Sequence, residues 1–134
     1  SDGKANLHQG AVGVGIEIAT GLTAHGVWQN RSVADHPDFG VSLSNLEIPN
    51  WPRLLELGAR CYELTGLGYL GVDIVIDRTH GPLLLELNAR PGLAIQIANG
   101  RGLRGRLEAV DRLESIPETA LERVQLACDL FRIH

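Results

Sequence analysis

Two runs of residues that alternate in polarity, joined by a short turn, constrain the fold of this chain more than any other feature. The first run is Gly71–Asp77, within a strand predicted over 68–77; the second is Pro82–Asn88, and Arg78–Gly81 lies between them. Side chains of a strand point alternately to opposite faces, and two such runs around a short connection predict an antiparallel hairpin. We therefore expect two paired strands with one apolar face against the core and one face that carries acids.

The register of this predicted hairpin follows from its pattern. A four-residue turn pairs Asp77 with Pro82, and counting back along both strands pairs Asp73 with Glu86. A slip of one residue would set Asp73 against Leu85 and mix the two faces, so the hydrophobic pattern fixes the register. The expected apolar face, which would pack on the core, carries Val72, Ile74, Ile76, Leu83, Leu85 and Leu87.

The other face places two carboxylates opposite each other. Like charges at directly opposed positions destabilise a sheet, so the pair of Asp73 and Glu86 needs an explanation. A divalent cation between them would remove the repulsion, and Asn88, two residues on, adds a neutral oxygen on the same face. Few, hard oxygen ligands suit Mg²⁺ better than Ca²⁺, which prefers about six to eight oxygens. A solvated sheet face on which the acids only maintain solubility is the alternative, and the three residues alone leave both open.

The residues that follow the second strand favour the metal interpretation. Arg90 presents a planar cation suited to phosphate oxygens, although an ordinary surface arginine paired with an acid is the alternative. Pro91 and Gly92 then lead into a predicted short helix over 93–99. Gly13 and Gly15, in contrast, lie inside a strand pattern without a following helix, so they do not predict a phosphate-binding loop.

Periodicity along the rest of the chain predicts strands before the hairpin and helices around it. The order of elements favours an α+β fold in which an antiparallel sheet packs against helices. The predicted elements are strands over 11–18 and 23–29, a loop over 30–50, a helix that starts after the N-cap Asn50 with Pro52 in its first turn and ends at Gly66, and helices over 103–113 and 117–132.

Composition excludes several functional classes. The net charge of −4 gives no reason to expect a nucleic-acid or membrane partner. Cys61 and Cys128 lack a CxxC spacing and are expected to be reduced thiols of a cytoplasmic protein. No Ser-His-Asp or Cys-His arrangement predicts a covalent nucleophile.

Two motifs, in the right order, resemble those of ATP-grasp ligases. Glu86–Gly92 after Gly71–Asp73 is similar to the metal-binding signature of these enzymes. The segment Lys4–Ala11 resembles the Arg-Ser-Asn-Leu-His-Arg-Gly-Gly segment of the glutamate-ligase branch, which includes ligases that modify ribosomal proteins. The chain is most similar to α-L-glutamate ligase-like proteins. The chain starts at Ser1 and contains no Met, so we expect it to be a piece of a longer protein. The resemblance implies that residues 1–134 are the carboxy-terminal subdomain of an ATP-grasp domain, without the N-terminal nucleotide lobe.

The resemblance implies a role for each matching residue of the hairpin region. Asp73, Glu86 and Asn88 would bind Mg²⁺, with Glu86 bridging two ions and Asn88 completing the second site. Arg90 would hold the phosphoryl group during its transfer.

The opening motif implies a second group of contacts. Asn6 would contact the triphosphate, Lys4 would take the place of a basic residue that contacts substrate or phosphate, and His8 would be either a ligand contact or a structural histidine. Lys4, Gln9 and Ala11 depart from the Arg, Arg and Gly of the family pattern. These departures reduce positive charge near the acceptor site, so the acceptor of the known ligases is not carried over.

The function implied by the resemblance is that of an ATP-dependent carboxylate–amine ligase that forms an amide through an acyl-phosphate. It would use ATP and two Mg²⁺ ions, with amino-acid or peptide carboxylates and amines as substrates, and a homo-oligomer is compatible with the sequence. This piece alone is expected to be inactive. The alternative is a non-catalytic interaction domain derived from the same scaffold, although such a domain should have lost at least one costly charge from the site.

Overall fold

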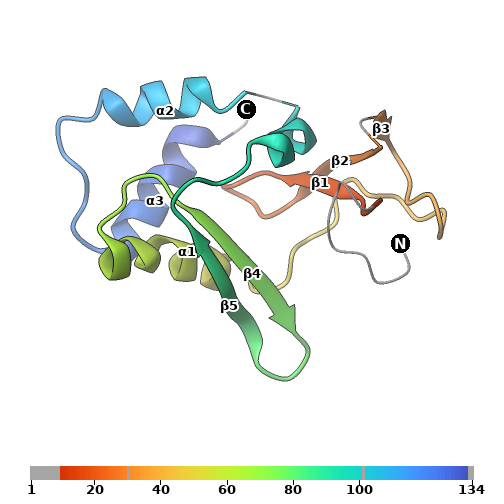
Figure 1. Ribbon diagram of the computed structural model, residues 1–134, viewed down its shortest axis with the longest axis horizontal. Coiled ribbons are helices and arrows are strands. Elements are labelled where there is room, and N and C mark those ends of the chain that lie inside the picture. Colours follow the sequence, from red (N-terminus) through yellow and green to blue (C-terminus); the bar gives the residue numbers. More distant parts are fainter. Residues whose placement is uncertain (1–9, 30, 101, 133–134) are drawn as a thin grey trace.

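The computed structural model describes residues 10–29, 31–100 and 102–132 of the chain. Over these residues the chain forms two antiparallel sheets, three α-helices and a 3-10 helix (Figure 1). The predicted α+β fold class is therefore confirmed. Within the same residues, no helix combines the length and the apolar character that would be needed to cross a lipid bilayer.

The first sheet has the strand order β1-β2-β3, with each neighbouring pair antiparallel. The predicted hairpin of the first two strands is confirmed with shorter bounds, β1 (Gly13–Ile16) and β2 (Thr23–Trp28). The third strand, β3 (Arg31–Val33), lies in the segment predicted as a loop. Three residues are too few to show an alternating pattern, so this strand had no periodic signal in the sequence.

The remainder of the predicted loop is held to the first sheet by backbone hydrogen bonds and by one buried side chain. The hydroxyl of Thr23 donates to the carbonyl oxygen of Leu43 at 2.6 Å and accepts from the backbone N–H of Leu46 at 2.9 Å. Thr23 is 7% exposed, so these bonds satisfy a polar group that water does not reach. The loop is thus ordered both by its contacts with β2 and by its own backbone hydrogen bonds, such as the one from the N–H of Leu43 to the carbonyl oxygen of Ala34 at 2.9 Å.

Both predicted boundaries of the first helix, α1 (Trp51–Thr65), are confirmed, but the predicted role of Asn50 needs a correction. Gly66 ends it in the left-handed conformation, with φ 69°, and donates to the carbonyl oxygen of Tyr62 at 2.7 Å. Asn50 precedes the helix but does not cap it with its side chain, because its own backbone is left-handed (φ 57°) and not extended as a side-chain cap requires. The carbonyl oxygen of Asn50 instead accepts from the N–H of Arg53 and Leu54.

The later helices are confirmed with shorter bounds. The segment predicted over 93–99 is the 3-10 helix η2 (Ala94–Asn99), and the helix over 103–113 is α2 (Arg104–Asp111). The last helix, α3 (Ala120–Phe131), begins three residues after Pro117 because Thr119 and Glu122 form a capping box.

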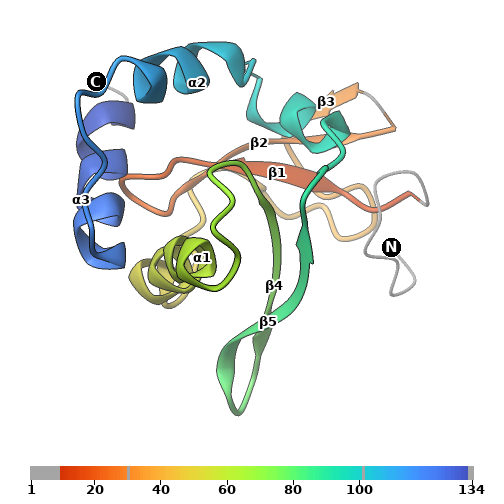
Figure 2. The same cartoon turned by 60° about the vertical axis from the view of Figure 1, so that its left-hand side comes forward.

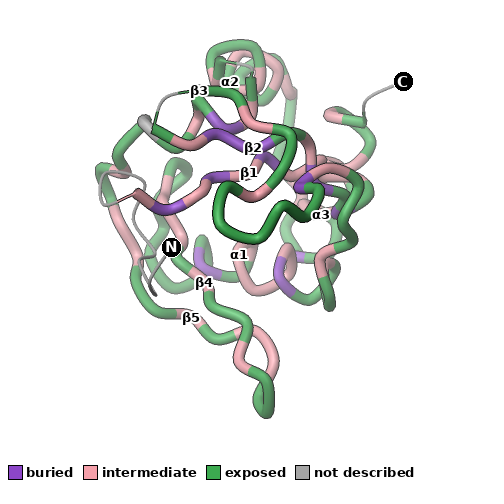
Figure 3. The backbone as a smooth tube through the Cα atoms, turned by 90° about the vertical axis from the view of Figure 1, so that its right-hand side faces the viewer, coloured by how far each residue is buried: buried purple, intermediate pink, exposed green. Residues whose placement is uncertain are grey.

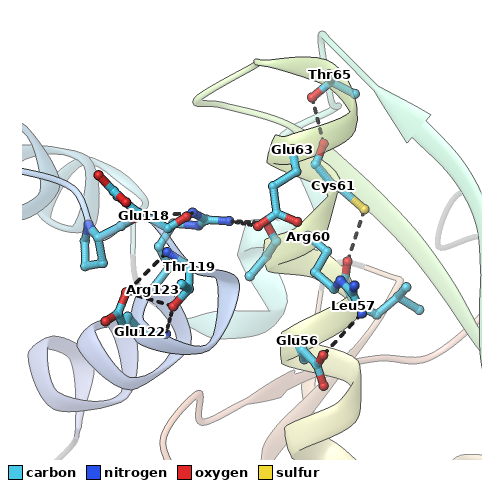
Figure 4. Close-up of polar contacts among 12 residues, drawn as sticks. Glu56, Leu57, Arg60, Cys61, Glu63, Thr65, Glu118, Thr119, Glu122 and Arg123 are labelled. Carbon is cyan, nitrogen blue, oxygen red and sulfur yellow. Dashed lines mark hydrogen bonds and ion pairs between the residues drawn. The ribbon is translucent and has the colours of Figure 1, made fainter.

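Arg123 joins α3 to α1 through a network of polar contacts (Figure 4). Its guanidinium donates to the carboxylate of Glu63 at 2.7 Å and to the carbonyl oxygens of Pro117, Glu118 and Ala59. The same group lies 5.2 Å above the ring of Tyr62. The Arg123 side chain is only 13% exposed, whereas that of Glu63 is 45% exposed, so a largely buried guanidinium links the two helices.

An apolar groove of about 920 Å³ opens between the helices and the apolar face of the strand Gly71–Asp77. Leu54 of α1, Val72 and Ile74 of that strand, and Leu126 and Phe131 of α3 are among the residues that line it. Much of the apolar surface stays accessible to water, and the fully buried positions lie mainly on β1, β2 and α1 (Figure 3). The structure therefore has a modest closed core beside an open apolar surface.

Candidate functional site

The second sheet is the predicted acid-bearing hairpin, made of β4 (Gly71–Asp77) and β5 (Gly81–Asn88). It extends away from the first sheet, with α1 packed beside it (Figures 1 and 2). Asp73 of β4 is directly paired with Glu86 of β5. The pairing predicted from the hydrophobic pattern is confirmed.

The turn that closes the hairpin differs from the prediction by one residue. Asp77 pairs with Gly81 and not with Pro82, so the connection has one residue fewer than expected. A carboxylate oxygen of Asp77 accepts from the backbone N–H of Thr79 at 2.9 Å and of His80 at 2.8 Å, which tightens the turn. Gly81 follows with φ 73°, a conformation that a residue with a side chain seldom adopts.

A β-bulge between the turn and the acids compensates for the shorter turn. The register shifts between Asp73 and Ile74, because Ile74 pairs with Leu84 while Asp73 pairs with Glu86. Leu85 is therefore the extra residue of β5, and it leaves the acids paired as the longer turn would have paired them.

The bulge also changes which leucines face the core, and here the predicted apolar face is wrong. Leu84 pairs with the groove-lining Ile74 and is half-buried, whereas the prediction placed it on the polar face. Leu83 pairs with Val75 on the acid-bearing face and is 41% exposed, and Leu85 is 66% exposed. Alternation fails because it assumes an unbroken strand, and a bulge reverses the phase of every residue on its far side.

The predicted metal ligands share one face at the inner end of the hairpin. Asp73 and Glu86 are exposed, and Asn88, two residues further along β5 and opposite Gly71, is half-buried. Arg90 is exposed and follows β5 by two residues. The side chains of Asp73, Glu86 and Arg90 form no hydrogen bond or ion pair with any other residue in the described part of the chain.

This arrangement fits a magnesium ion. Two directly opposed carboxylates with no cationic partner among the described residues, next to an amide oxygen, offer the hard donors that Mg²⁺ binds while leaving positions for phosphate and water. In the ranges 10–29, 31–100 and 102–132, no three His, Cys, Asp or Glu side chains gather around one point. The predicted magnesium ligands are two carboxylates and the amide of Asn88. This site therefore does not require a cluster of three His, Cys, Asp or Glu side chains.

The segment after β5 packs back on the rest of the molecule. Pro91 lies against Gly71 at the start of β4, and η2 lies against β1 beside Gly15 (Figure 2). Sequence reasoning did not assign a role to Gly15, and the only signal for it was a glycine inside a strand, which often marks a close approach of another backbone. Lys4, Asn6 and His8, the other predicted site residues, lie outside the described residues.

Comparison with known proteins gives the family context of this site. Residues 1–112 match the family of sugar-transfer associated ATP-grasp proteins. A curated protein of Parasynechococcus marenigrum (strain WH8102), named "Probable alpha-L-glutamate ligase", is 37% identical over 79 residues. That alignment covers 58% of this chain and 17% of the relative, so the chain matches only a small part of that protein. No solved structure matches the chain. Because the family match covers most of its length, including the whole acid-bearing hairpin, the chain belongs to the sugar-transfer associated ATP-grasp family.

Proposed function

We propose that this chain is the Mg²⁺- and ATP-binding lobe of an ATP-dependent carboxylate–amine ligase. The observation that carries the proposal is the direct pairing of Asp73 with Glu86 on an exposed face, with Asn88 and Arg90 next to it, in a chain of the ATP-grasp family. The relative's name supports glutamate or a similar amino acid as a substrate.

Each residue of the site has a proposed role. Asp73, Glu86 and Asn88 hold magnesium, which when bound supplies positive charge next to the phosphate oxygens of ATP. Arg90 binds the oxygens of the phosphoryl group in transfer, where a planar, permanently charged donor stabilises spreading negative charge. Because Arg90 has no ion-pair partner among the described residues, its charge is available for this contact.

The proposed reaction needs no covalent bond to the protein. A carboxylate oxygen of the substrate attacks the γ-phosphorus of ATP, and the bond to the bridging oxygen breaks, which releases ADP. An amine then attacks the acyl carbon, loses a proton, and displaces phosphate to give the amide. The task of this chain is to position and neutralise the phosphates, which accounts for most of the catalysis in phosphoryl transfer.

Three further roles extend the proposal to the first residues of the chain. Asn6 contacts the triphosphate, Lys4 contacts phosphate or substrate, and His8 contacts ligand in the same region. We also propose that residues 1–134 act as the carboxy-terminal subdomain of a cytoplasmic protein whose remaining part supplies the nucleotide lobe. Amino-acid or peptide carboxylates and amines are its substrates.

A second candidate function is a non-catalytic interaction domain, and the apolar groove favours it. A groove of about 920 Å³ that opens to solvent is typical of surfaces that bind another macromolecule. An interaction domain does not explain why Asp73 is paired with Glu86 or why Arg90 lies next to them. This alternative therefore explains fewer features of the site than the ligase proposal.

Turnover separates the two candidates. The protein that contains this chain would be expressed at full length and assayed for ADP release with Mg²⁺ and each of the amino acids in turn. Glu86→Gln removes one proposed ligand charge, and Glu114→Gln removes an exposed acid that lies outside the hairpin. We expect amino-acid-dependent ADP release that Glu86→Gln abolishes and Glu114→Gln retains. Unchanged turnover in Glu86→Gln would refute the metal assignment, and wild-type protein without turnover would favour the interaction domain.

A further inference from the structure

The segment that carries Asn88 and Arg90 is fixed in space by its backbone and not by contacts of Arg90. After Asn88 the chain passes through Arg90 and Pro91 and continues as η2. The side chain of Arg90 forms no polar contact with a described residue, so its position depends on where the chain on either side of it is held. The chain is held at two places, where Pro91 and η2 pack against a glycine outside the segment.

The first point of support is Gly71, at the start of β4. A Cβ atom added to Gly71 would lie 2.7 Å from Cβ and 3.5 Å from Cγ of Pro91, and 3.3 Å from Cβ of Asn88. Carbon atoms in contact lie about 3.5–4.0 Å apart, so Pro91 would have to move by about 1 Å. The proline ring restricts its backbone, and a rotation of the side chain does not relieve the clash. The absence of a side chain at Gly71 therefore allows the chain after Asn88 to fold back over β4.

The second point of support is Gly15, which is buried in β1. A Cβ atom there would lie 2.5 Å from the carbonyl oxygen of Ala98 and 3.0 Å from Cα of Asn99. Both are backbone atoms of η2, so the added methyl group could be accommodated only by moving η2 itself. Neither Gly15 nor Gly71 has a positive φ, so these positions require space and not the conformational freedom of glycine.

Several other glycines lack this requirement, although Cβ atoms added to Gly21 and Gly26 would also meet side-chain atoms at 2.5 Å. A Cβ atom added to Gly68, three residues before Gly71, would meet nothing within 4 Å, and the same holds for Gly102, which follows η2. These two positions have no positive φ and are matched controls for Gly71 and Gly15.

We propose that Gly71 and Gly15 are positioning residues of the phosphate-binding segment: by leaving room for Pro91 and η2, they set the place of Asn88 and Arg90 relative to Asp73 and Glu86. This inference rests on the proposed function for its catalytic consequence, but its structural part does not. A displacement of about 1 Å in a reacting or positioning group costs about 100-fold in rate. We expect Gly71 to have the larger effect, because it contacts the residue next to Arg90.

The test compares Gly71→Ala with Gly68→Ala, and Gly15→Ala with Gly102→Ala, in the full-length protein. We expect kcat to fall about 10- to 100-fold in Gly71→Ala, with KM for ATP changed less than kcat, and to stay near the wild-type value in Gly68→Ala. Mn²⁺, used in place of Mg²⁺ as a spectroscopic probe, should bind more weakly to Gly71→Ala because Asn88 is displaced. Gly15→Ala should show the same changes to a smaller extent, and Gly102→Ala should show none.

A double variant distinguishes positioning from general loss of structure. Pro91→Gly removes the Cβ atom that the new methyl group of Gly71→Ala would strike. The variant Gly71→Ala/Pro91→Gly should therefore recover Mn²⁺ affinity and part of kcat relative to Gly71→Ala, which a double-mutant cycle measures as non-additivity. This holds even where Gly71→Ala alone does not fold, because the 2.7 Å contact with Pro91 is absent from the double variant and only the 3.3 Å contact with Cβ of Asn88 remains.

The outcomes separate this inference from the proposed function. An active wild-type protein in which Gly71→Ala behaves like Gly68→Ala, or in which the two substitutions are additive, overturns the positioning role. A wild-type protein without turnover or Mn²⁺ binding overturns the proposed function instead. In that case, crystal structures of the Gly71→Ala and Gly68→Ala variants test the inference. If the inference holds, Arg90 is displaced in Gly71→Ala and not in Gly68→Ala. If the inference fails, Arg90 is unmoved in both variants.

Discussion

Asp73 and Glu86 occupy directly opposed positions on β4 and β5, and no other described residue neutralises either carboxylate. Without a bound cation these charges repel each other across the hairpin, and like charges so placed destabilise a sheet. The pair therefore destabilises the folded protein, and a bound divalent ion would make its contribution to stability favourable.

Glu86→Gln should reverse the effect of magnesium on stability. Without divalent ions the variant should be more stable than the wild-type protein by a few tenths of a kcal/mol, because one repelling charge is gone and solvent screens what remains. With Mg²⁺ in excess the wild-type protein should gain stability and the variant should gain less. Thermal unfolding with EDTA and with Mg²⁺ measures both, and Glu114→Gln is the control. Equal Mg²⁺-dependent gains in the wild type and in Glu86→Gln would contradict the assignment.

The bulge predicts an unusual order of stability for two neighbouring leucines. Leu84→Ala should lower the free energy of unfolding by about 1–2 kcal/mol, less than the roughly 2–5 kcal/mol of fully buried leucines, because Leu84 is only half-buried. Leu85→Ala should change it by less than about 0.5 kcal/mol, because the side chain is 66% exposed. Urea unfolding of both variants provides the comparison. A regular hairpin without the bulge predicts the opposite order.

The sequence pattern predicted the acid pair and the fold class but not the bulge. Asp73 and Glu86 could be paired from the sequence because a one-residue slip would have mixed apolar and polar faces. The turn could not be counted correctly, because the hydrogen bonds from Thr79 and His80 to Asp77 shorten it by one residue. Periodicity does not record such local bonds, and three consecutive leucines in β5 hide the position of the extra residue.

Glycines and loops limited the prediction of the site in a different way. The role of Gly15 depends on the carbonyl oxygen of Ala98, which is distant in sequence, and a single sequence does not reveal such a contact. Asn50 is the N-cap residue as predicted, but its left-handed backbone conformation, which residue type does not reveal, prevents its side chain from capping α1.

Arg123 should contribute far more to stability than its ion-pair partner. Arg123→Ala should cost about 2–3 kcal/mol, because it removes a largely buried side chain that donates to three carbonyl oxygens and a carboxylate, and two of those carbonyl oxygens are part-buried. Glu63→Gln should cost at most about 1 kcal/mol, since the Glu63 side chain is 45% exposed and the arginine keeps its other partners. Chemical denaturation measures the two changes. Equal costs would mean that the ion pair, and not the carbonyl contacts, holds α3 to α1.

The two cysteines should differ in their reaction with alkylating reagents. Burial raises the pKa of both the Cys61 and the Cys128 thiols above the ordinary value of 9.0, so at neutral pH each has less reactive thiolate than a free cysteine. Cys61 is also only 1% exposed. Iodoacetamide should therefore modify Cys128 slowly and Cys61 only after unfolding, as followed by mass spectrometry. Modification of Cys61 at the rate of Cys128 in the folded protein would contradict the packing of α1.

The turn of the hairpin should make a pH-dependent contribution to stability. Hydrogen bonds from the backbone of His80, and then of Thr79, lower the pKa of Asp77 below its ordinary value of 3.8. A lowered folded-state pKa gives stability that is present above the unfolded value and is lost as the pH falls through the folded value. Below pH 3.8 the melting temperature of the wild-type protein should thus fall more steeply than that of Asp77→Ala. Parallel curves for the two proteins would exclude this contribution, and Asp111→Ala controls for the loss of an exposed carboxylate.

The length of chain between Asp73 and Glu86 fits two different hairpins. One has the bulge and the pairing of Asp77 with Gly81, as in this structure. The other would have a longer turn, no bulge, and the pairing of Asp77 with Pro82. Both contain the same residues and both end on the same pairing of the acids. The outer half of the hairpin could therefore move from one register to the other, by shifting a single irregularity along β5, while the two carboxylates keep their relative positions. A change of register at the tip of the hairpin is thus compatible with a fixed pairing of Asp73 with Glu86.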